Sequence, residues 1–367
     1  MNEHVETVVI GAGQAGLSTA YHLRRRGHDC VVLDAHRRVG DNWRHQWDTL
    51  RLFTPARYDG LPGLPFPGDP WAFPTKDEVA DYLEGYAHRW DLPVRTGVRV
   101  HRLGRADGHF VLDTSLGTLT ADNVVVATGT FGRTPHVPSF AADLDPSILQ
   151  LHSSEYRRAD QLAPGPALVV GASHSGGDIA YELAASRRVV LCGPDRGQLP
   201  LHIESRAAHA VVPLLVFLAR HLLTRRTPIG RHLMEEVRFH GGPLIRVRRA
   251  DLAARGVDRA EPRMSGVREG RPVLDDGRVL DVTNVVWCTG FRQHFEWIDL
   301  PVIGEDGWPR ELRGVAHDCP GLFFCGLSFQ SGFGSMVFFG VGRDAEYVAR
   351  RVVDRTVSRG AALAHAG

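Results

Sequence analysis

One pattern occurs twice in this chain: an apolar strand, a glycine-rich turn, a helix and a second apolar strand. The first copy begins at Thr7 and ends at Asp34. Within it Gly11 permits the tight turn, Gly13 allows the backbone to approach a pyrophosphate, and Gly16 allows the helix to pack closely on the strand. The helix N-terminus offers unpaired N–H groups to phosphate, and Asp34 suits a pair of ribose hydroxyls. This copy therefore predicts a dinucleotide site.

The second copy begins at Ala167, and its turn reads Gly171-Ala172-Ser173-His174-Ser175-Gly176. A further stretch is echoed as well, because residues 119–129 read LTADNVVVATG and residues 280–290 read LDVTNVVWCTG. Both features recur at a spacing of about 160 residues. We therefore expect an α/β fold with two Rossmann-like dinucleotide-binding domains.

The C-terminal piece has an apolar strand at 321–326 and a helix to about Val353, but no fingerprint of its own. We infer that it completes the first domain and that the second domain is inserted in the first. Alternating runs over 98–126 predict a β-meander, which makes the first domain a three-layer ββα unit. Thr75 and Glu78 have capping-box spacing and predict a helix to about Trp90. The expected units are a first domain at 1–160 and 291–355, a second at 161–290 with a helical insert at about 198–262, and a flexible tail at 356–367.

Composition narrows the range of partners. The formal net charge is +1, which gives no electrostatic reason to expect nucleic acid or an anionic membrane. The N-terminus leads almost directly into the first strand, so we expect no signal peptide and a cytoplasmic protein. The most apolar stretch, 211–223, is too short to span a bilayer. The insert around it could form a lid or an oligomer face, so a homodimer is left open.

Neither cysteine nor histidine spacing predicts a metal site. The five cysteines contain no C-x-x-C pair and resemble small core residues in a reducing compartment. The nineteen histidines include no H-E-x-x-H. The basic run at 246–249 is interpreted as a solvated face.

The two fingerprints, each followed by a strand that ends in Ala-Thr-Gly or Cys-Thr-Gly, resemble the flavoproteins with two dinucleotide-binding domains. Residues 152–157 (HSSEYR) resemble the identifying segment of class B flavin monooxygenases, F-x-G-x-x-x-H-x-x-x-Y. Tyr156 at its end resembles the flavin-containing branch more than the Baeyer–Villiger branch. Pro146 and Ile148 stand where the family has Phe and Gly. Residues 39–44 (VGDNWR) resemble the family's Gly-Gly-x-Trp segment beside the flavin.

The resemblance implies FAD in the first domain and NADPH in the second, with NADH as an alternative. In such enzymes NADPH reduces FAD, and the reduced flavin binds O₂ as a C4a-(hydro)peroxide. One oxygen atom then passes to a small organic substrate, either an N- or S-containing compound or a carbonyl compound. Two other readings stay open, an NAD(P)H oxidase or flavin reductase and a non-catalytic nucleotide-sensing flavoprotein.

The resemblance also assigns residues to each cofactor, while flavin chemistry leaves no catalytic side chain certain. The expected FAD residues are Gly11, Gly13, Gln14, Ala15, Gly16, Asp34, Ala35, Asn42, Trp43, Arg44, Val100, Ala127, Thr128, Gly129 and Gly326. The expected NAD(P)H residues are Gly171, Ser173, His174, Ser175, Gly176, Arg196, Cys288, Thr289 and Gly290. The candidate substrate pocket consists of Trp47, Phe53, Thr54 and Ser335.

The end of the second copy bears on the choice between NADPH and NADH. Its last strand ends in Cys192-Gly193 and lacks an acidic residue that would repel a 2′-phosphate. Arg196 offers bidentate donors to that phosphate. Asp195 could instead serve the ribose of NADH. His174 could contact the cofactor or solvent, and His152 is interpreted as a structural residue of the linker between the domains.

Overall fold

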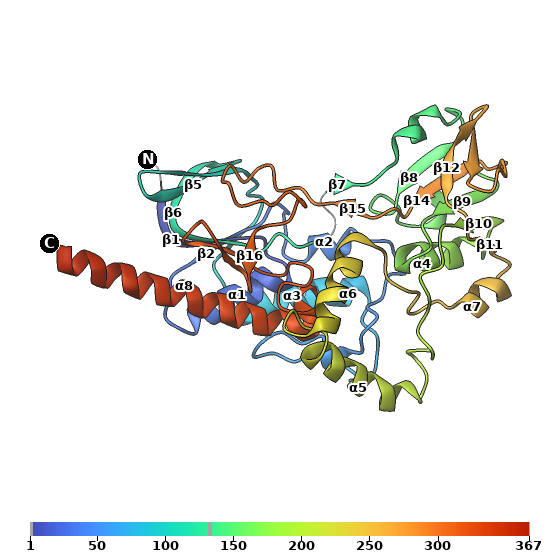
Figure 1. The fold of residues 1–367 in the computed structure, drawn as a ribbon. Helices are drawn as coiled ribbons and strands as arrows, with labels where there is room; N and C mark the ends of the chain where they lie inside the picture. Colours follow the sequence, from blue (N-terminus) through green and yellow to red (C-terminus); the bar gives the residue numbers. More distant parts are fainter. Residues whose placement is uncertain (1–2, 131–133, 367) are drawn as a thin grey trace.

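The computed structural model describes residues 3–130 and 134–366 and has two separate parallel sheets (Figure 1). In the first, the strands run in the order β18-β6-β1-β2-β3 and are parallel. Their bounds are Glu3–Ile10 (β1), Val31–Leu33 (β2), Val94–Arg95 (β3), Gly117–Val126 (β6) and Leu322–Phe324 (β18). The C-terminal piece thus supplies a strand to the first sheet, as expected.

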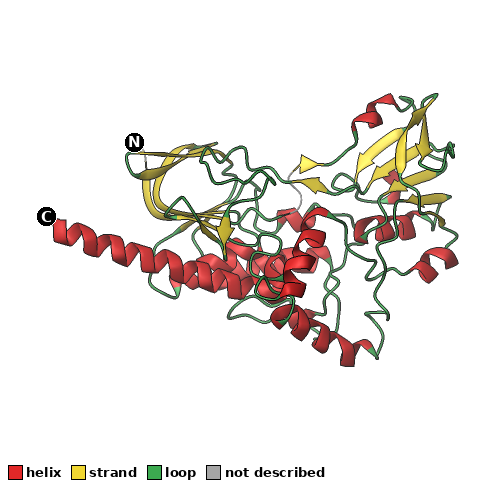
Figure 2. Cartoon of the chain, in the orientation of Figure 1, coloured by secondary structure: helices red, strands yellow, loops and turns green. Residues whose placement is uncertain are grey.

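One face of this sheet is covered by helices (Figure 2). They are α1 (Gln14–Arg24), α3 (Lys76–Arg89) and α8 (Phe338–Ala366). Thr75 caps α3 in the predicted capping box. The other face packs against a meander in which β4 (Val100–Ala106), β5 (His109–Thr114) and β6 are antiparallel. Short strands β16 (Glu311–Leu312) and β17 (Val315–Ala316) extend the edge beside β18. The expected three-layer ββα unit is present.

The second sheet has the order β11-β10-β9-β14-β8, and all its strands are parallel. The bounds are Leu149–His152 (β8), Ala167–Val170 (β9), Val189–Cys192 (β10), Asp258–Ala260 (β11) and Asn284–Trp287 (β14). Helices α4 (His174–Leu183) and α7 (Arg249–Ala254) and the hairpin of β12 (Met264–Arg268) and β13 (Arg271–Leu274) accompany it. Where the chain passes from one sheet to the other, β7 (Thr134–Pro135) pairs with β15 (Phe291–Arg292).

Two expected boundaries differ from the structure. Strand β8 belongs to the second sheet, although it precedes residue 161, because it pairs with β14 over its whole length. Sequence patterns do not reveal which of two parallel sheets a short strand joins. Helix α8 continues to Ala366, where a flexible tail is expected from 356. Its alanines favour helix, and Arg359 anchors this part of it to Asp122, with Nη1 2.6 Å from Oδ1.

The insert packs on the first unit and not only on the second. Its helices α5 (Ala208–His221) and α6 (Pro228–Phe239) follow β10. Val212 and Val216 of α5 form a small core with Trp71 and Phe339. The Phe333 N–H donates to the Leu223 carbonyl at 2.9 Å. The insert therefore lies over the C-terminal piece of the first unit. None of the described helices is long and apolar enough to cross a membrane.

Candidate dinucleotide sites

The two glycine turns have the same geometry. Gly11 and Gly171 both have φ +108°, and each donates its N–H to the end of the next strand, at 2.7 Å to Leu33 and 2.9 Å to Cys192. A Cβ on Gly16 would lie 1.8 Å from the Gly11 carbonyl oxygen. A Cβ on Gly176 would lie 1.7 Å from that of Gly171. Both turns thus need glycine to bring helix and strand together, which confirms the internal repeat.

The first turn is shaped to admit a phosphate. A Cβ on Gly13 would meet no atom within 4 Å, so this glycine is not required by the protein's own packing. Asp34 accepts from the Ala12 N–H at 2.7 Å and from the backbone N–H and ring Nδ1 of His36, at 2.8 and 2.9 Å. Burial alone would raise the pKa of Asp34, but these hydrogen bonds outweigh it and hold the pKa below its ordinary value. The ionised carboxylate stands at the end of β2, where it can accept ribose hydroxyls.

The C-terminal piece completes the surroundings of this turn. Gln14 donates from Nε2 to the Met336 carbonyl at 3.3 Å, and Gly326 approaches Ala15 so closely that a Cβ would lie 2.6 Å from the Ala15 Cβ. The short helix η4 (Phe333–Met336) includes Ser335, which is buried and accepts from the Ser331 N–H at 2.9 Å. Ser335 is therefore held by backbone contacts and is not an open pocket wall.

Several buried polar atoms of the first unit have no protein partner. Among the described residues they include Trp43 Nε1, Ser328 Oγ and Gln330 Nε2. Buried donors and acceptors normally find partners, so each of these atoms could pair with a bound polar group. The open position at Gly13 and the ionised Asp34 beside the turn fit a flavin dinucleotide. Trp43 also packs near Phe338, with ring centroids 6.2 Å apart.

The remaining residues expected at FAD fall into two groups. Ala35, Ala127, Thr128 and Gly129 follow the carboxyl ends of β2 and β6, and Val100 begins β4. Residues 41–44 form the short helix α2, which includes Asn42. The Arg44 guanidinium forms ion pairs with Asp41, Asp81 and Glu84 at 2.9–3.1 Å. It ties α2 to α3.

The four candidate pocket residues have different surroundings. Trp47 is buried in the core of the second unit with Tyr156. Phe53 stacks on His174, with ring centroids 6.0 Å apart. Thr54 donates to Asp59 at 2.5 Å. Trp47 and Phe53 contact residues of the second unit, so the aromatic stretch joins the two units. Alternation of apolar residues does not reveal that these side chains contact another domain.

Asp59 gives a prediction for pH. It is fully buried, and burial raises its pKa to about 8 against the opposing hydrogen bond from Thr54. Between about pH 4 and pH 8 the folded carboxyl keeps a proton that the unfolded one loses, so stability falls as pH rises through this window. Asp59→Asn should raise the free energy of unfolding at pH 8 by about 1 kcal/mol or more, with little gain at pH 4. Denaturant unfolding at both pH values measures this.

The exposed Asp258 gives the matched control for Asp59. Asp258→Asn should change stability by the same small amount at both pH values. A gain from Asp59→Asn that is equal at pH 4 and pH 8 would contradict a protonated Asp59.

The second turn is covered by the chain itself. Ser173 donates from Oγ to the Gly242 carbonyl at 2.7 Å. A Cβ on Gly242 would lie 2.6 Å from His174 Nε2, and His174 Nδ1 is buried without a protein partner. Burial lowers the pKa of His174 to about 4, so the ring is neutral at neutral pH. His174 is thus half-buried between Phe53 and the segment 240–243 that follows α6.

Other residues expected at the second site lie around the same strand ends. Cys288, Thr289 and Gly290 follow β14, and Ser175 lies in the first turn of α4. Thr289 donates to the His136 carbonyl. The Gly290 carbonyl lies 3.0 Å from His152 Nε2. Residues 287–290 and β8 are therefore held together where the chain crosses between the units.

Several arginines surround the end of β10. Arg249 pairs with Asp195, and Arg259 donates to the Gly193 carbonyl at 2.6 Å. Arg196 is partly exposed, and no hydrogen bond or ion pair of its side chain occurs within the described part of the chain. Its guanidinium remains available to a phosphate. Asp195, the alternative contact for an NADH ribose, has its charge compensated by Arg249.

The interpretation of 246–249 as a solvated face is wrong in part. Val247 is buried, Arg246 lies 3.6 Å from Asp178, and Arg249 holds Asp195. Arg249 is thus a candidate site residue. It could not be predicted from the sequence, because a run of basic residues does not indicate which distant acidic residue one of them will pair with. Arg259 was missed because its contact with the Gly193 carbonyl joins residues 66 positions apart.

The linker segment is structural and joins both units. Tyr156 donates to Glu182 Oε1 of α4 at 2.7 Å, and Thr49 of the aromatic stretch donates to the same carboxylate. Burial lowers the pKa of His152. A neutral His152 and a protonated Tyr156 act here as hydrogen-bonding anchors.

A model of the family described as pyridine nucleotide-disulphide oxidoreductase matches residues 8–205. The chain belongs to this family. It is 36% identical over 356 residues to an "oxidoreductase CzcO-like" of Geobacillus kaustophilus, covering 96% of this chain and 100% of the relative. It is 35% identical over 187 residues to indole-3-pyruvate monooxygenase YUCCA1 of Oryza sativa, which is 48% of this chain and 44% of that one. The flavin-containing monooxygenase of Stenotrophomonas maltophilia superposes with a TM-score of 0.76 at 28% identity, covering 96% and 99% of the two chains.

This flavin-containing monooxygenase-like oxidoreductase does not carry the dithiol that the family's description suggests. All five cysteines are free, and the sequence has no C-x-x-C. Burial raises the pKa of Cys30 and Cys325 to about 12 and that of Cys192 to about 11, and it raises the pKa of Cys288 and Cys319 as well. A thiolate is the reactive form of cysteine, so disulfide exchange is disfavoured at each of these residues.

Proposed function

We propose that this protein is a monooxygenase that uses FAD and NADPH and transfers one oxygen atom from O₂ to a small organic substrate. The observation that carries the proposal is the pair of glycine turns with matching geometry, one of them open at Gly13 and followed by Asp34 at the end of the next strand. The similarity to a flavin-containing monooxygenase over nearly the whole chain supports it. We take the substrate class to be N- or S-containing compounds or carbonyl compounds.

Each turn would hold one dinucleotide. At the first, the N-terminus of α1 would receive the FAD pyrophosphate and Asp34 the adenosine ribose. At the second, the N-terminus of α4 would receive the pyrophosphate of NADPH, and Arg196 its 2′-phosphate. Bound FAD would supply electron transfer and the activation of O₂. Trp43 and Phe338 would help to exclude water from the flavin.

The test uses protein loaded with FAD. NADPH should bleach the flavin absorbance under anaerobic conditions. With methyl p-tolyl sulfide and ¹⁸O₂, the sulfoxide should carry one ¹⁸O atom, and less H₂O₂ should appear than NADPH consumed. Reduction followed by H₂O₂ alone with sulfide, amine and ketone probes would indicate an oxidase. Absence of reduction by NADPH and NADH would favour a nucleotide sensor.

The segment 240–243 must move before NADPH reaches α4, because the Gly242 carbonyl lies against Ser173 at the helix N-terminus. Ser173→Ala removes one hydrogen bond that holds the segment in place. The dissociation constant for NADPH should fall by about two- to tenfold, given a net value of about 0.5–1.5 kcal/mol for such a bond. Fluorescence titration of the oxidised protein measures it.

The matched control is Ser186→Ala, an exposed serine beyond the C-terminal end of α4, which leaves the contact with Gly242 intact. Weaker NADPH binding by Ser173→Ala would contradict the model of a covering segment and would instead indicate that Ser173 Oγ contacts the cofactor.

A further inference from the structure

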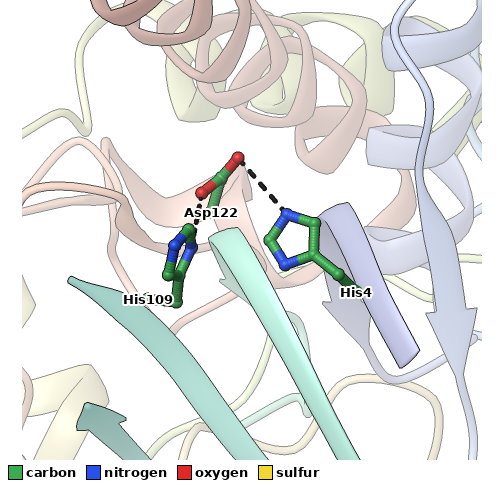
Figure 3. A group of neighbouring side chains, drawn as sticks. All are labelled: His4, His109 and Asp122. Atoms are coloured by element: carbon green, nitrogen blue, oxygen red, sulfur yellow. Dashed lines mark hydrogen bonds and ion pairs between the residues drawn. The ribbon is translucent and has the colours of Figure 1, made fainter. Parts of the chain in front are cut away.

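Three side chains far from both glycine turns converge on one point at the start of the first sheet. His4 lies on β1, Asp122 on β6 and His109 on β5. These strands are adjacent in the order β1-β6-β5. Figure 3 shows the two imidazole rings turned toward the Asp122 carboxylate from either side. Residues this far apart in the sequence form no spacing motif, so only the fold reveals the group.

The distances suit a metal ion. His109 Nδ1 lies 2.9 Å from Asp122 Oδ1, and His4 Nε2 lies 3.6 Å from Oδ2 (Figure 3). One ligand atom from each of the three residues lies within 4.8 Å of the others. Ligands bound tetrahedrally to Zn²⁺ at about 2.0–2.2 Å are about 3.4 Å apart. The ion would replace the proton that His109 donates to Asp122.

Outer contacts already orient two of the three ligands. The second nitrogen of His4, Nδ1, lies 3.1 Å from Thr120 Oγ1, which leaves Nε2 to face Asp122. Arg359 donates to Asp122 Oδ1 at 2.6 Å, and Oδ2 faces His4. Such contacts fix the orientation of ligands in metal sites. The positive charge of Arg359 opposes a cation, so the affinity should be moderate.

We propose that His4, His109 and Asp122 form a binding site for a divalent transition metal of the Zn²⁺ class. Two imidazole nitrogens and one carboxylate favour Zn²⁺ or Co²⁺ over Mg²⁺ or Ca²⁺, which prefer oxygen ligands. The site lies about 20 Å along β1 from Gly11, so it takes no part in flavin chemistry. Its role is structural: the ion would link β1 to the β5–β6 meander, which Arg359 connects to α8.

The test uses the purified full chain without a histidine tag, after bound metal has been removed. Calorimetric titration should show one Zn²⁺ per chain, and Co²⁺ should give a visible band at wavelengths longer than the flavin absorption. His4→Ala and His109→Ala should each weaken Zn²⁺ binding at least about tenfold. His101→Ala on β4, an exposed histidine outside the group, should not.

Thermal unfolding gives a second readout. Saturating Zn²⁺ should raise the melting temperature of the wild-type chain by about 2 °C or more and that of His109→Ala by much less. Melting of each variant without metal shows whether it is folded. No stoichiometric binding by the wild-type chain, or equal binding by His4→Ala, His109→Ala and His101→Ala, would overturn the proposal.

Discussion

Gly16→Ala should abolish flavin retention, whereas Gly13→Ala should leave the fold intact and weaken flavin binding alone. The Cβ on residue 16 would lie 1.8 Å from the Gly11 carbonyl oxygen, so α1 must shift away from β1. We expect a loss of about 1–3 kcal/mol or more in stability. A Cβ on residue 13 meets no protein atom within 4 Å, but it would stand where the pyrophosphate approaches.

Flavin content after gel filtration and the melting temperature of the flavin-free protein separate the two effects. For Gly13→Ala we expect an unchanged melting temperature and at least about a tenfold loss of FAD affinity, equivalent to about 1.4 kcal/mol. Gly85→Ala within α3 is the matched control, because its Cβ meets nothing within 4 Å and alanine favours helix. Retention of FAD by Gly13→Ala at the wild-type level would refute the assignment of the pyrophosphate to this turn.

Arg249→Ala should weaken NADPH binding while leaving NADH binding nearly unchanged. The substitution removes the partner of Asp195 at the end of β10, and the freed carboxylate would repel a 2′-phosphate. Arg196→Ala should act in the same direction by removing a donor to that phosphate. Because hydrogen bonds to charged groups contribute about 1.5–3 kcal/mol, each loss should be about 10- to 100-fold. Rates of flavin reduction over a range of NADPH and NADH concentrations measure it.

Arg188 is the matched control, since it is exposed and precedes β10 at the opposite end of that strand. Arg188→Ala should not change the ratio of the NADPH and NADH constants. Equal losses for both cofactors in Arg249→Ala and Arg196→Ala would show that these residues maintain the fold of the site and do not select the phosphate.

The insert contacts residues near both glycine turns. Helix α5 packs on Trp71 and Phe339 of the first unit, and the segment that follows α6 covers the second turn at Ser173. Displacement of that segment by NADPH would therefore act on a region that also contacts η4, next to the first turn. This gives a physical route by which NADPH binding could affect the surroundings of the flavin.

Features that depend on local backbone geometry can be predicted from the sequence alone. Gly11 and Gly171 adopt the positive φ that their turns require, Gly16 and Gly176 provide the close approach of helix to strand, and Thr75 caps α3. These features involve residues that are near in the chain, so spacing and residue type are enough to predict them.

The contacts between distant residues around the two glycine turns are visible only in the folded chain. Gln14 reaches Met336, Phe53 stacks on His174 of the other unit, and Arg249 compensates Asp195. The covering of Ser173 by Gly242 and the meeting of His4 with His109 are of the same kind. Such contacts depend on how the two sheets and the insert pack together. The local sequence pattern therefore does not predict which distant residues a side chain will contact.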